Sequence, residues 1–214
     1  QSNTLSLHDA LPIYTSGKNQ LTHVDDVVPL ANYGDDIDDQ LSGNYSYDEI
    51  GNLISDQAEQ IQEIKWTVYG KIKSIIRSSG SAKPNLAYEY SPDGHRVYKK
   101  VTQPNGNIKE TYYIRDAQGN TMSTYTYDTD TFRWSEAHIY GSSRIGIYNA
   151  EKVLVIGNTV NSSTLQANEY ENIRGKRHYE LSNHLGNVLA VISDRRTGIC
   201  TGNGLIAYNA EVVS

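Results

Sequence analysis

The sequence predicts an all-β protein in which tandem antiparallel β-hairpins join into one curved, spiralling sheet. Three observations predict this fold: the chain is rich in tyrosine, short polar turn motifs recur along it, and the segments between them alternate as strands do. Tyrosine accounts for 17 of the 214 residues, against a single phenylalanine, and the whole hydrophobic share is only 37%. We therefore expect a thin apolar core, with tyrosines doing much of the packing.

Four segments share one turn motif, in which a short polar residue is followed three positions later by glycine. These residue types suit a type I turn, because the polar side chain accepts backbone N–H groups and the glycine takes a positive φ. The four pairs are Asp48/Gly51, Ser91/Gly94, Asp116/Gly119 and Asn183/Gly186. We expect all eight residues to have architectural roles.

Two weaker copies of the motif carry Gly70 and Gly141. With them, the marker glycines stand at 51, 70, 94, 119, 141 and 186, so most steps are 19 to 25 residues and the last step is close to two periods. A repeat of this length is typical of arrays built from one supersecondary unit.

The residues beside the turns favour strands. Val97–Val101 and Thr124–Tyr127 alternate and are rich in β-branched and aromatic residues, as half-buried strands are. A single hairpin is marginal in water, so we expect these hairpins to associate edge to edge. Tyrosine rings lying over cross-strand neighbours would each contribute roughly 0.2–1 kcal/mol.

Two stretches depart from the strand pattern. In residues 55–64, Asp56 precedes Glu59 by three positions and apolar residues recur every third position; this resembles a capping box and predicts a short helical crossover. Residues 25–44 hold many aspartates and few apolar side chains, which predicts an acidic surface loop.

Composition argues against several classes of partner. The net charge of −6 and the absence of a basic cluster argue against a nucleic-acid-binding face. No apolar run is long enough to cross a bilayer. The single cysteine, Cys200, excludes an internal disulfide framework and a thiolate metal cage.

The sequence predicts no catalytic, cofactor-binding or metal-binding residue and no cofactor. His178 and Glu180 match half of a zinc-deaminase motif whose cysteine pair is missing, and the spacing of His178 and His184 fits no common metal-ligand pattern. The acidic residues 25–39 lack the register of a calcium loop. The glycines of residues 198–204 lack the Gly-Lys-Ser/Thr ending of a phosphate loop.

Two other functions stay open from the residues alone. A pair of glycosidase carboxylates is defined by distance in space, which the sequence does not reveal. Exposed tyrosines with Trp66 and Trp134 are also of the type that stacks on sugars, although cross-strand packing explains the same residues.

Two segments resemble a known family. Tyr47-Asp48 followed by Gly51-Asn52-Leu53 is similar to the YD-repeat signature of bacterial RHS proteins, and Tyr179–Arg196 resembles the segment that introduces their RHS repeat-associated core domain. The resemblance covers about residues 14–214. It divides the chain into a YD-repeat sheet over 14–177 and the start of the core segment over 178–214.

The resemblance implies a structural role. YD repeats of this family wind into a hollow β-shell that in many bacterial members encloses a C-terminal toxin. We therefore expect a non-enzymatic part of a secreted or surface bacterial protein, with the rest of the parent protein and its cargo as partners. The family's self-cleavage motif does not occur before Ser214, so no protease residue is carried over and the chain resembles a truncated excerpt.

The N-terminal segment stands apart from the repeat. Residues 4–13 do not match it and resemble translated adapter sequence, so residues 1–13 are expected to be non-native or disordered; the alternative is an ordinary N-terminal strand.

Three functions are weighed at this point. The first is the shell segment, the second a β-repeat adhesion module that binds cell-surface carbohydrate through exposed Tyr and Trp, and the third a hydrolase with scattered carboxylates. A sheet cut from a longer spiral has open strand edges, so the fragment alone is expected to self-associate.

Overall fold

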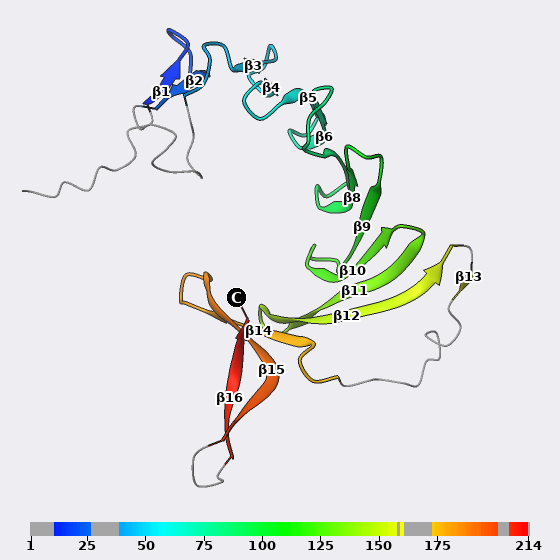
Figure 1. The fold of residues 1–214 in the computed structure, drawn as a ribbon. Helices are drawn as coiled ribbons and strands as arrows, with labels where there is room; N and C mark the ends of the chain where they lie inside the picture. The colour runs from blue at the N-terminus through cyan, green and yellow to red at the C-terminus, as the bar shows by residue number, and fades with distance from the viewer. Residues whose placement is uncertain (1–10, 27–38, 158, 161–172, 201–205, 214) are drawn as a thin grey trace, which may run out of the picture. The chain divides into compact units, whose positions relative to one another are not determined.

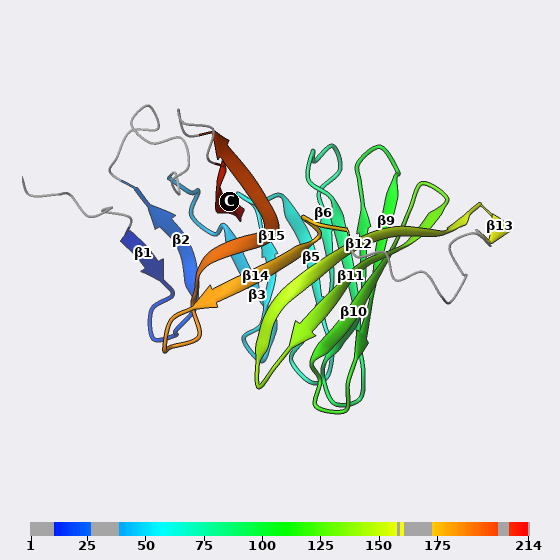
Figure 2. The same cartoon turned by 90° about the horizontal axis from the view of Figure 1, so that it is seen from below.

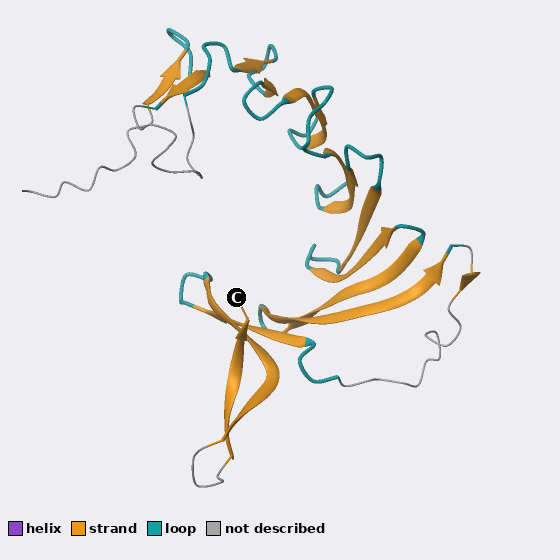
Figure 3. Ribbon diagram, viewed as in Figure 1, coloured by secondary structure: helices purple, strands orange, loops and turns teal. Residues whose placement is uncertain are grey.

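The computed structural model describes residues 11–26, 39–157, 159–160, 173–200 and 206–213 (Figure 1). These residues form sixteen β-strands and no helix (Figure 3). All of the strand pairings are antiparallel. The predicted all-β fold of antiparallel hairpins is therefore confirmed.

The chain divides into two compact units, residues 1–88 with 101–107 (unit 1) and residues 89–100 with 108–214 (unit 2). Strands β7 and β8 contribute residues to both units. The first strands are β1 (Leu11–Tyr14), β2 (Leu21–Asp25), β3 (Tyr45–Tyr47), β4 (Leu53–Asp56), β5 (Ile61–Trp66), β6 (Ile72–Arg77), β7 (Asn85–Tyr90) and β8 (Arg96–Thr102). The remaining strands are β9 (Ile108–Arg115), β10 (Thr121–Asp128), β11 (Thr131–Tyr140), β12 (Arg144–Ile156), β13 (Thr159–Val160), β14 (Arg177–Ser182), β15 (Val188–Cys200) and β16 (Ile206–Val213).

The strands follow one another as a meander. The strand order is β3 through β12, then β14, β15 and β16, while β1 and β2 form a separate two-stranded sheet. Figure 2 shows β9 to β12 side by side in unit 2. The departure from the meander is at β12, where β13 pairs with Val155 and Ile156 and β14 pairs with Gly146–Tyr148.

The described residues bury few apolar side chains. Only Val24, Ile64 and Ala150 are buried hydrophobic residues among them. The strands that contact each other are hydrogen-bonded neighbours. Strands β2 and β3 are also in contact, although they belong to different sheets. Each unit therefore rests on cross-strand packing, because little of its apolar surface lies inside a second layer.

The helical crossover predicted for residues 55–64 is wrong. Strand β4 ends at Asp56 and β5 begins at Ile61, with a tight turn between them. The Asp56 carboxylate does accept the N–H of Glu59, at 3.1 Å, as a capping residue would. The chain then turns back at Gln60, whose φ is 55°, so a local pattern shared by helix starts and hairpin turns misled the prediction.

Two described residues of the predicted acidic loop are buried, whereas Asp25, Asp39 and residues 41–43 are exposed. Asp26 is buried and its N–H donates to Asp39 Oδ1 at 2.5 Å. Asn44 is 2% exposed, and its amide donates to Asp56 Oδ1 at 3.0 Å. Residues 27–38 lie outside the described part of the chain, and so does that part of the loop prediction.

The N-terminal segment is described from residue 11. Leu11–Tyr14 pairs with β2, Leu11 standing opposite Asp25. Residues 11–13 are therefore part of a strand, and residues 1–10 lie outside the description. No helix that could cross a membrane occurs among the described residues.

Candidate functional site

The predicted turn residues of unit 2 build a recurring hairpin turn. In the turn that joins β9 to β10, the N–H of Asp116 donates to the carbonyl of Asn120 at 3.0 Å and the N–H of Gly119 donates to that of Asp116 at 3.1 Å. Gly119 has a φ of 85°. This is a type I turn followed by a G1 bulge. Ser91/Gly94 and Asn183/Gly186 make the same pair of backbone bonds, with φ of 83° and 84° at the glycines.

The first side chain of the turn holds its backbone. Asp116 Oδ1 accepts the N–H groups of Gln118 and Asn120 at 3.0 and 2.8 Å, and the Asn120 amide donates to Oδ2 at 2.8 Å. That amide and the backbone donors lower the pKa of Asp116 below its usual value, since they stabilise the carboxylate. Asn183 accepts the N–H groups of Leu185 and Asn187 in the same way.

Ser91 uses its side chain differently. Its hydroxyl donates to the Asp93 carboxylate and also lies 3.0 Å from the carbonyl oxygen of His95. The hydrogen bond from Ser91 lowers the pKa of Asp93. In this turn the carboxylate two positions later supplies the negative charge that Asp116 supplies in its own turn.

Two more of the predicted turns lie in unit 1. Gly51 has a φ of 92°, and its N–H donates to the carbonyl of Asp48 at 3.1 Å. Desolvation raises the pKa of Asp48, but the hydrogen bonds from Asn52 and the turn backbone together lower it. Gly70, with a φ of 69°, donates to the carbonyl of Thr67 at 3.1 Å.

Gly141 lies between β11 and β12 in a different connection. Its N–H donates to the carbonyl of Ser143 at 2.9 Å, and its φ is not in the positive range. The register of the two flanking strands shifts at Ile139 and Tyr140. The chain therefore reverses here without the left-handed glycine found in the other turns.

Gly106 and Gly146 have structural roles that the sequence motif did not predict. Gly106, with a φ of 86°, closes a further turn by donating to the carbonyl of Gln103 at 2.9 Å. Its first residue is glutamine, which the motif did not admit, but the Gly-Asn pair shared with three other turns could have revealed it. Gly146 lies within β12 and has no local signal.

Neighbouring turns of unit 2 contact each other. Because hairpin turns alternate between the two ends of a meander, 91–95 and 116–120 lie at the same end. The His95 imidazole occupies the place that a Cβ on Gly119 would need. The period of the marker glycines thus corresponds to two strands, which return the chain to the same end of the sheet.

An aromatic group with one carboxylate lies across β8 to β11. We call it the tyrosine–glutamate cluster: Tyr98, Glu110, Tyr112, Tyr125 and Phe132. The hydroxyls of Tyr98 and Tyr112 donate to the two oxygens of Glu110 at 2.6 and 2.9 Å. Ring centroids lie 5.3 Å apart for Tyr98 and Tyr112, and 5.7 Å for the stacked pair Tyr125 and Phe132.

The chemistry of this cluster is that of packing. Desolvation, followed by the hydrogen bond to Glu110, raises the pKa of both Tyr98 and Tyr112. Both phenols are therefore protonated donors at neutral pH. Since the rings pack against one another, the cluster resembles the cross-strand pairs that stabilise a sheet.

The indole N–H of each tryptophan donates a hydrogen bond to a group on another strand. Trp66 donates to the carbonyl of Leu53 at 2.8 Å. Trp134 donates to Ser123 Oγ at 2.7 Å and stacks at a tilt on Tyr148, with centroids 6.0 Å apart. These contacts are those expected of cross-strand packing.

A histidine with a largely covered side chain lies on β11. The side chain of His138 is 9% exposed, and its Nδ1 is buried without a hydrogen-bond partner. Its Nε2 lies 3.7 Å from Glu136 Oε2, and its ring stacks on Tyr140. Burial, then the charge of Arg144, lowers the pKa of His138.

The histidines considered as metal ligands lie in different places. His178 is in β14, where its Nδ1 lies 3.2 Å from the amide nitrogen of Asn149. His184 is exposed in the turn after that strand. Among the described residues, no three His, Cys, Asp or Glu side chains are grouped so that they could hold a metal ion. The side chain of Cys200 lies outside the described side chains.

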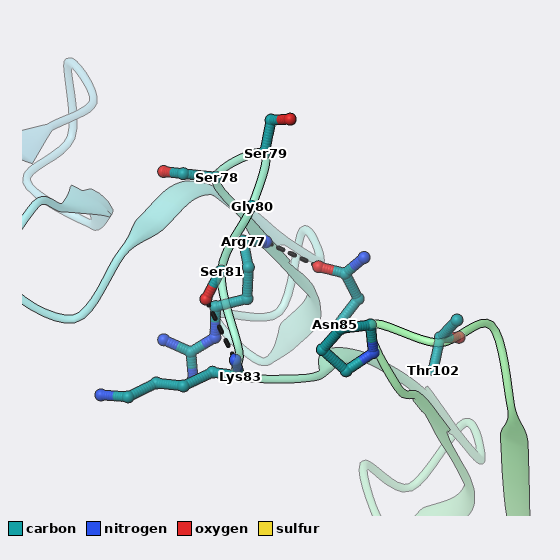
Figure 4. A pocket seen from close by; sticks show the side chains of 9 residues that line it. Arg77, Ser78, Ser79, Gly80, Ser81, Lys83, Asn85 and Thr102 are labelled. Atoms are coloured by element: carbon teal, nitrogen blue, oxygen red, sulfur yellow. Dashed lines mark hydrogen bonds between the residues drawn. The ribbon is translucent and has the colours of Figure 1, made fainter.

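Unit 1 has an open pocket of about 340 Å³ beside the loop that joins β6 to β7 (Figure 4). Arg77 and Lys83 bring positive charge to it. Lys83 Nζ lies 2.6 Å from Glu59 Oε2, and Arg77 donates to the Glu59 carbonyl at 2.5 Å. The Lys83 ammonium lowers the pKa of Glu59. The two cations thus hold the loop to the β4–β5 turn.

Among known proteins, no family model matches this chain and no curated protein matches it.

Proposed function

We propose that the chain is a non-enzymatic structural segment of a secreted or surface-exposed bacterial protein of the RHS/YD-repeat type, in which it forms part of a β-shell wall. The observation that carries this proposal is the recurring turn. Asp48/Gly51, Ser91/Gly94, Asp116/Gly119 and Asn183/Gly186 make the same two backbone hydrogen bonds with a left-handed glycine. The residues that carry the family resemblance are thus the residues that shape the hairpins.

The packing of the strands supports the same role. Each strand contacts its hydrogen-bonded neighbours, and aromatic side chains such as Tyr98 and Tyr112 pack from strand to strand. A sheet stabilised in this way can be extended by adding hairpins, since no central core has to be rebuilt. Extension by repetition is what a wall requires.

On this proposal the partners are the remainder of the parent protein and a cargo that the wall encloses. The test is to sequence the gene on both sides of this coding region and to purify the whole product. We expect further tyrosine-rich turn repeats and a C-terminal segment that resists added protease while the repeats are intact. Digestion of that segment at the rate of the same segment expressed alone would overturn the proposal.

A glycan array with the whole protein distinguishes the wall from an adhesion module. The wall predicts no saturable binding. Saturable binding that is lost in Tyr112→Ala, a substitution of a residue that is 37% exposed, would replace the proposal with carbohydrate recognition. Turnover of glycoside or peptide substrates that one Asp or Glu substitution removes would instead support a hydrolase.

A further inference from the structure

Besides packing, the tyrosine–glutamate cluster brings two phenols together around one base. The ring centroids of Tyr98 on β8 and Tyr112 on β9 lie 5.3 Å apart, with the ring planes tilted by 54°. The two hydroxyls donate to the two oxygens of a single carboxylate, that of Glu110, at 2.6 and 2.9 Å. Rings held this close, with a base shared between their hydroxyls, have the arrangement that an oxidative coupling of phenols requires.

We propose that Tyr98 and Tyr112 are a site of oxidative cross-linking, at which a one-electron oxidant, such as a peroxidase acting with hydrogen peroxide, joins the two rings as dityrosine. The product is a covalent bond between side chains of β8 and β9 within one chain. Closing a loop in this way stabilises the fold chiefly by restricting the unfolded chain. The proposal does not depend on the wall function.

The reaction balances with the peroxide as the oxidant. Each phenol loses one electron and its hydroxyl proton, and the two radicals form a C–C bond between ring carbons that stand beside the hydroxyls. The hydrogens on those two carbons then move to the oxygens, so both rings are phenols again. Two tyrosine side chains and one molecule of hydrogen peroxide thus give one dityrosine and two molecules of water.

Glu110 supplies the proton acceptor for this oxidation. A neutral phenol gives up an electron readily only when its proton leaves at the same time, because the charged ring radical is a strong acid. Burial, followed by the hydrogen bond to Glu110, raises the pKa of Tyr98 and Tyr112, so both begin as neutral phenols. The carboxylate already accepts a hydrogen bond from each hydroxyl, so either proton can pass to it along that bond.

Exposure and side-chain direction favour this pair of tyrosines. Tyr112 is 37% exposed, so an oxidant in solution reaches it. Tyr113, the next residue along β9, points to the opposite face of the strand. Tyr125 stands opposite Tyr112 on β10, but its ring stacks on Phe132. Tyr98, in contrast, shares both a ring contact and a carboxylate with Tyr112.

The first test treats the dilute, purified chain with a peroxidase and hydrogen peroxide and maps the products by mass spectrometry after trypsin digestion. We expect a fluorescent peptide pair that joins Tyr98 to Tyr112 and is two hydrogen atoms lighter than the sum of its parts. The absence of this pair under conditions that couple a free tyrosine peptide would overturn the proposal. A main product that joins Tyr112 to Tyr125, or one chain to another, would overturn it too.

The second test uses substitutions that separate the pair from its surroundings. Tyr112→Phe should abolish the cross-link, because phenylalanine has no hydroxyl proton to lose. The matched control is Tyr113→Phe, which changes the adjacent ring, where Arg115 lies 5.7 Å from the centroid, and should retain the cross-link. Equal loss in the two variants would show that the coupling does not select this pair.

The third test examines the base. Glu110→Gln keeps an oxygen that accepts a hydrogen bond but cannot take up a proton at neutral pH, so the yield of the Tyr98–Tyr112 link should fall roughly tenfold or more. Far-UV circular dichroism checks that the variant is folded. An unchanged yield in a folded variant would overturn the role assigned to Glu110, whereas recovery of the yield in Glu110→Asp would support it.

Discussion

Gly186 and Gly146 are both glycines of unit 2, but the structure requires glycine at the two positions for different reasons. Gly186 has a φ of 84° and nothing within 4 Å of the place where a Cβ would stand. Gly146 is a buried strand residue whose Cβ would overlap the carbonyl oxygen of His178 on β14. The turn needs a backbone conformation, whereas the strand junction needs space.

This difference shows which requirements for glycine can be predicted from neighbouring residues in the sequence. A turn glycine stands beside its own polar partner, three positions away, so the motif is visible in a short window. The close approach of β12 and β14 joins residues 146 and 178–179, which are far apart in the chain. Substituting alanine at four glycines separates the two requirements.

Gly146→Ala should have the largest effect. The new methyl group would have to push the His178 backbone away, and the Cα of Tyr179 stands only 3.2 Å from it on the same side. Separating paired strands in this way should cost about 2–4 kcal/mol of unfolding free energy. Urea denaturation measures it. A loss smaller than that of Gly186→Ala would show that the junction does not depend on close approach.

Gly119→Ala should have the next largest effect. The substitution combines a φ of 85° with an overlap on the His95 ring. The ring is a movable side chain, so we expect about 1–3 kcal/mol of destabilisation, greater than the effect of positive φ alone. The double variant with His95→Ala isolates the φ component. If removal of the ring recovers no stability, the contact between neighbouring turns has no energetic role.

Gly186→Ala should cost about 1 kcal/mol, since only the positive φ opposes the methyl group. The measurement is again the unfolding free energy, supported by the melting temperature. Gly186→Asn should cost less, because asparagine tolerates the left-handed region better than alanine does. An unchanged melting temperature in the alanine variant would remove the left-handed turn at this position.

Gly141→Ala should have an effect within about 0.5 kcal/mol. Its φ is not positive and the nearest atom to the new methyl group, Ile145 Cγ2, is 3.8 Å away. It is therefore the matched control for the other three substitutions. A large loss here would mean that the connection between β11 and β12 depends on glycine in a way that the backbone angles do not explain.

Strand β11, through His138, and the Asp116 turn should lose stability over different pH ranges. The folded pKa of His138 is lowered from 6.5, so its contribution is greatest above that pH and falls as the pH drops below 6.5, where the unfolded chain binds a proton first. The pKa of Asp116 is lowered from 3.8, so the turn loses stability only below that value. His138→Gln should remove the upper step in unfolding free energy between pH 7.5 and 5 and leave the lower one. Retention of the upper step would assign it to another group.

The sequence predicts most of the fold because the relevant signals are short-range. Asp116 and Gly119 make their turn within five residues, and tyrosines alternate along single strands. The helix prediction for residues 55–64 was wrong, although Asp56 does accept the N–H of Glu59, because that bond also forms in a hairpin turn. The buried Nδ1 of His138 and the space needed at Gly146 arise from contacts between distant segments, so no local pattern reveals them.

The contact of each strand with its sheet neighbours has a consequence for how such a chain changes length. Deleting one interval between equivalent glycines, such as the 25 positions from Gly94 to Gly119, removes two strands. The strand before the first turn is then followed by the strand after the second turn, and the later turns stay at the same ends of the sheet. Deleting a single strand would send every later turn to the opposite end. Genes for chains of this type should therefore gain and lose strands in pairs, and odd-numbered changes should be rare among variants that still fold.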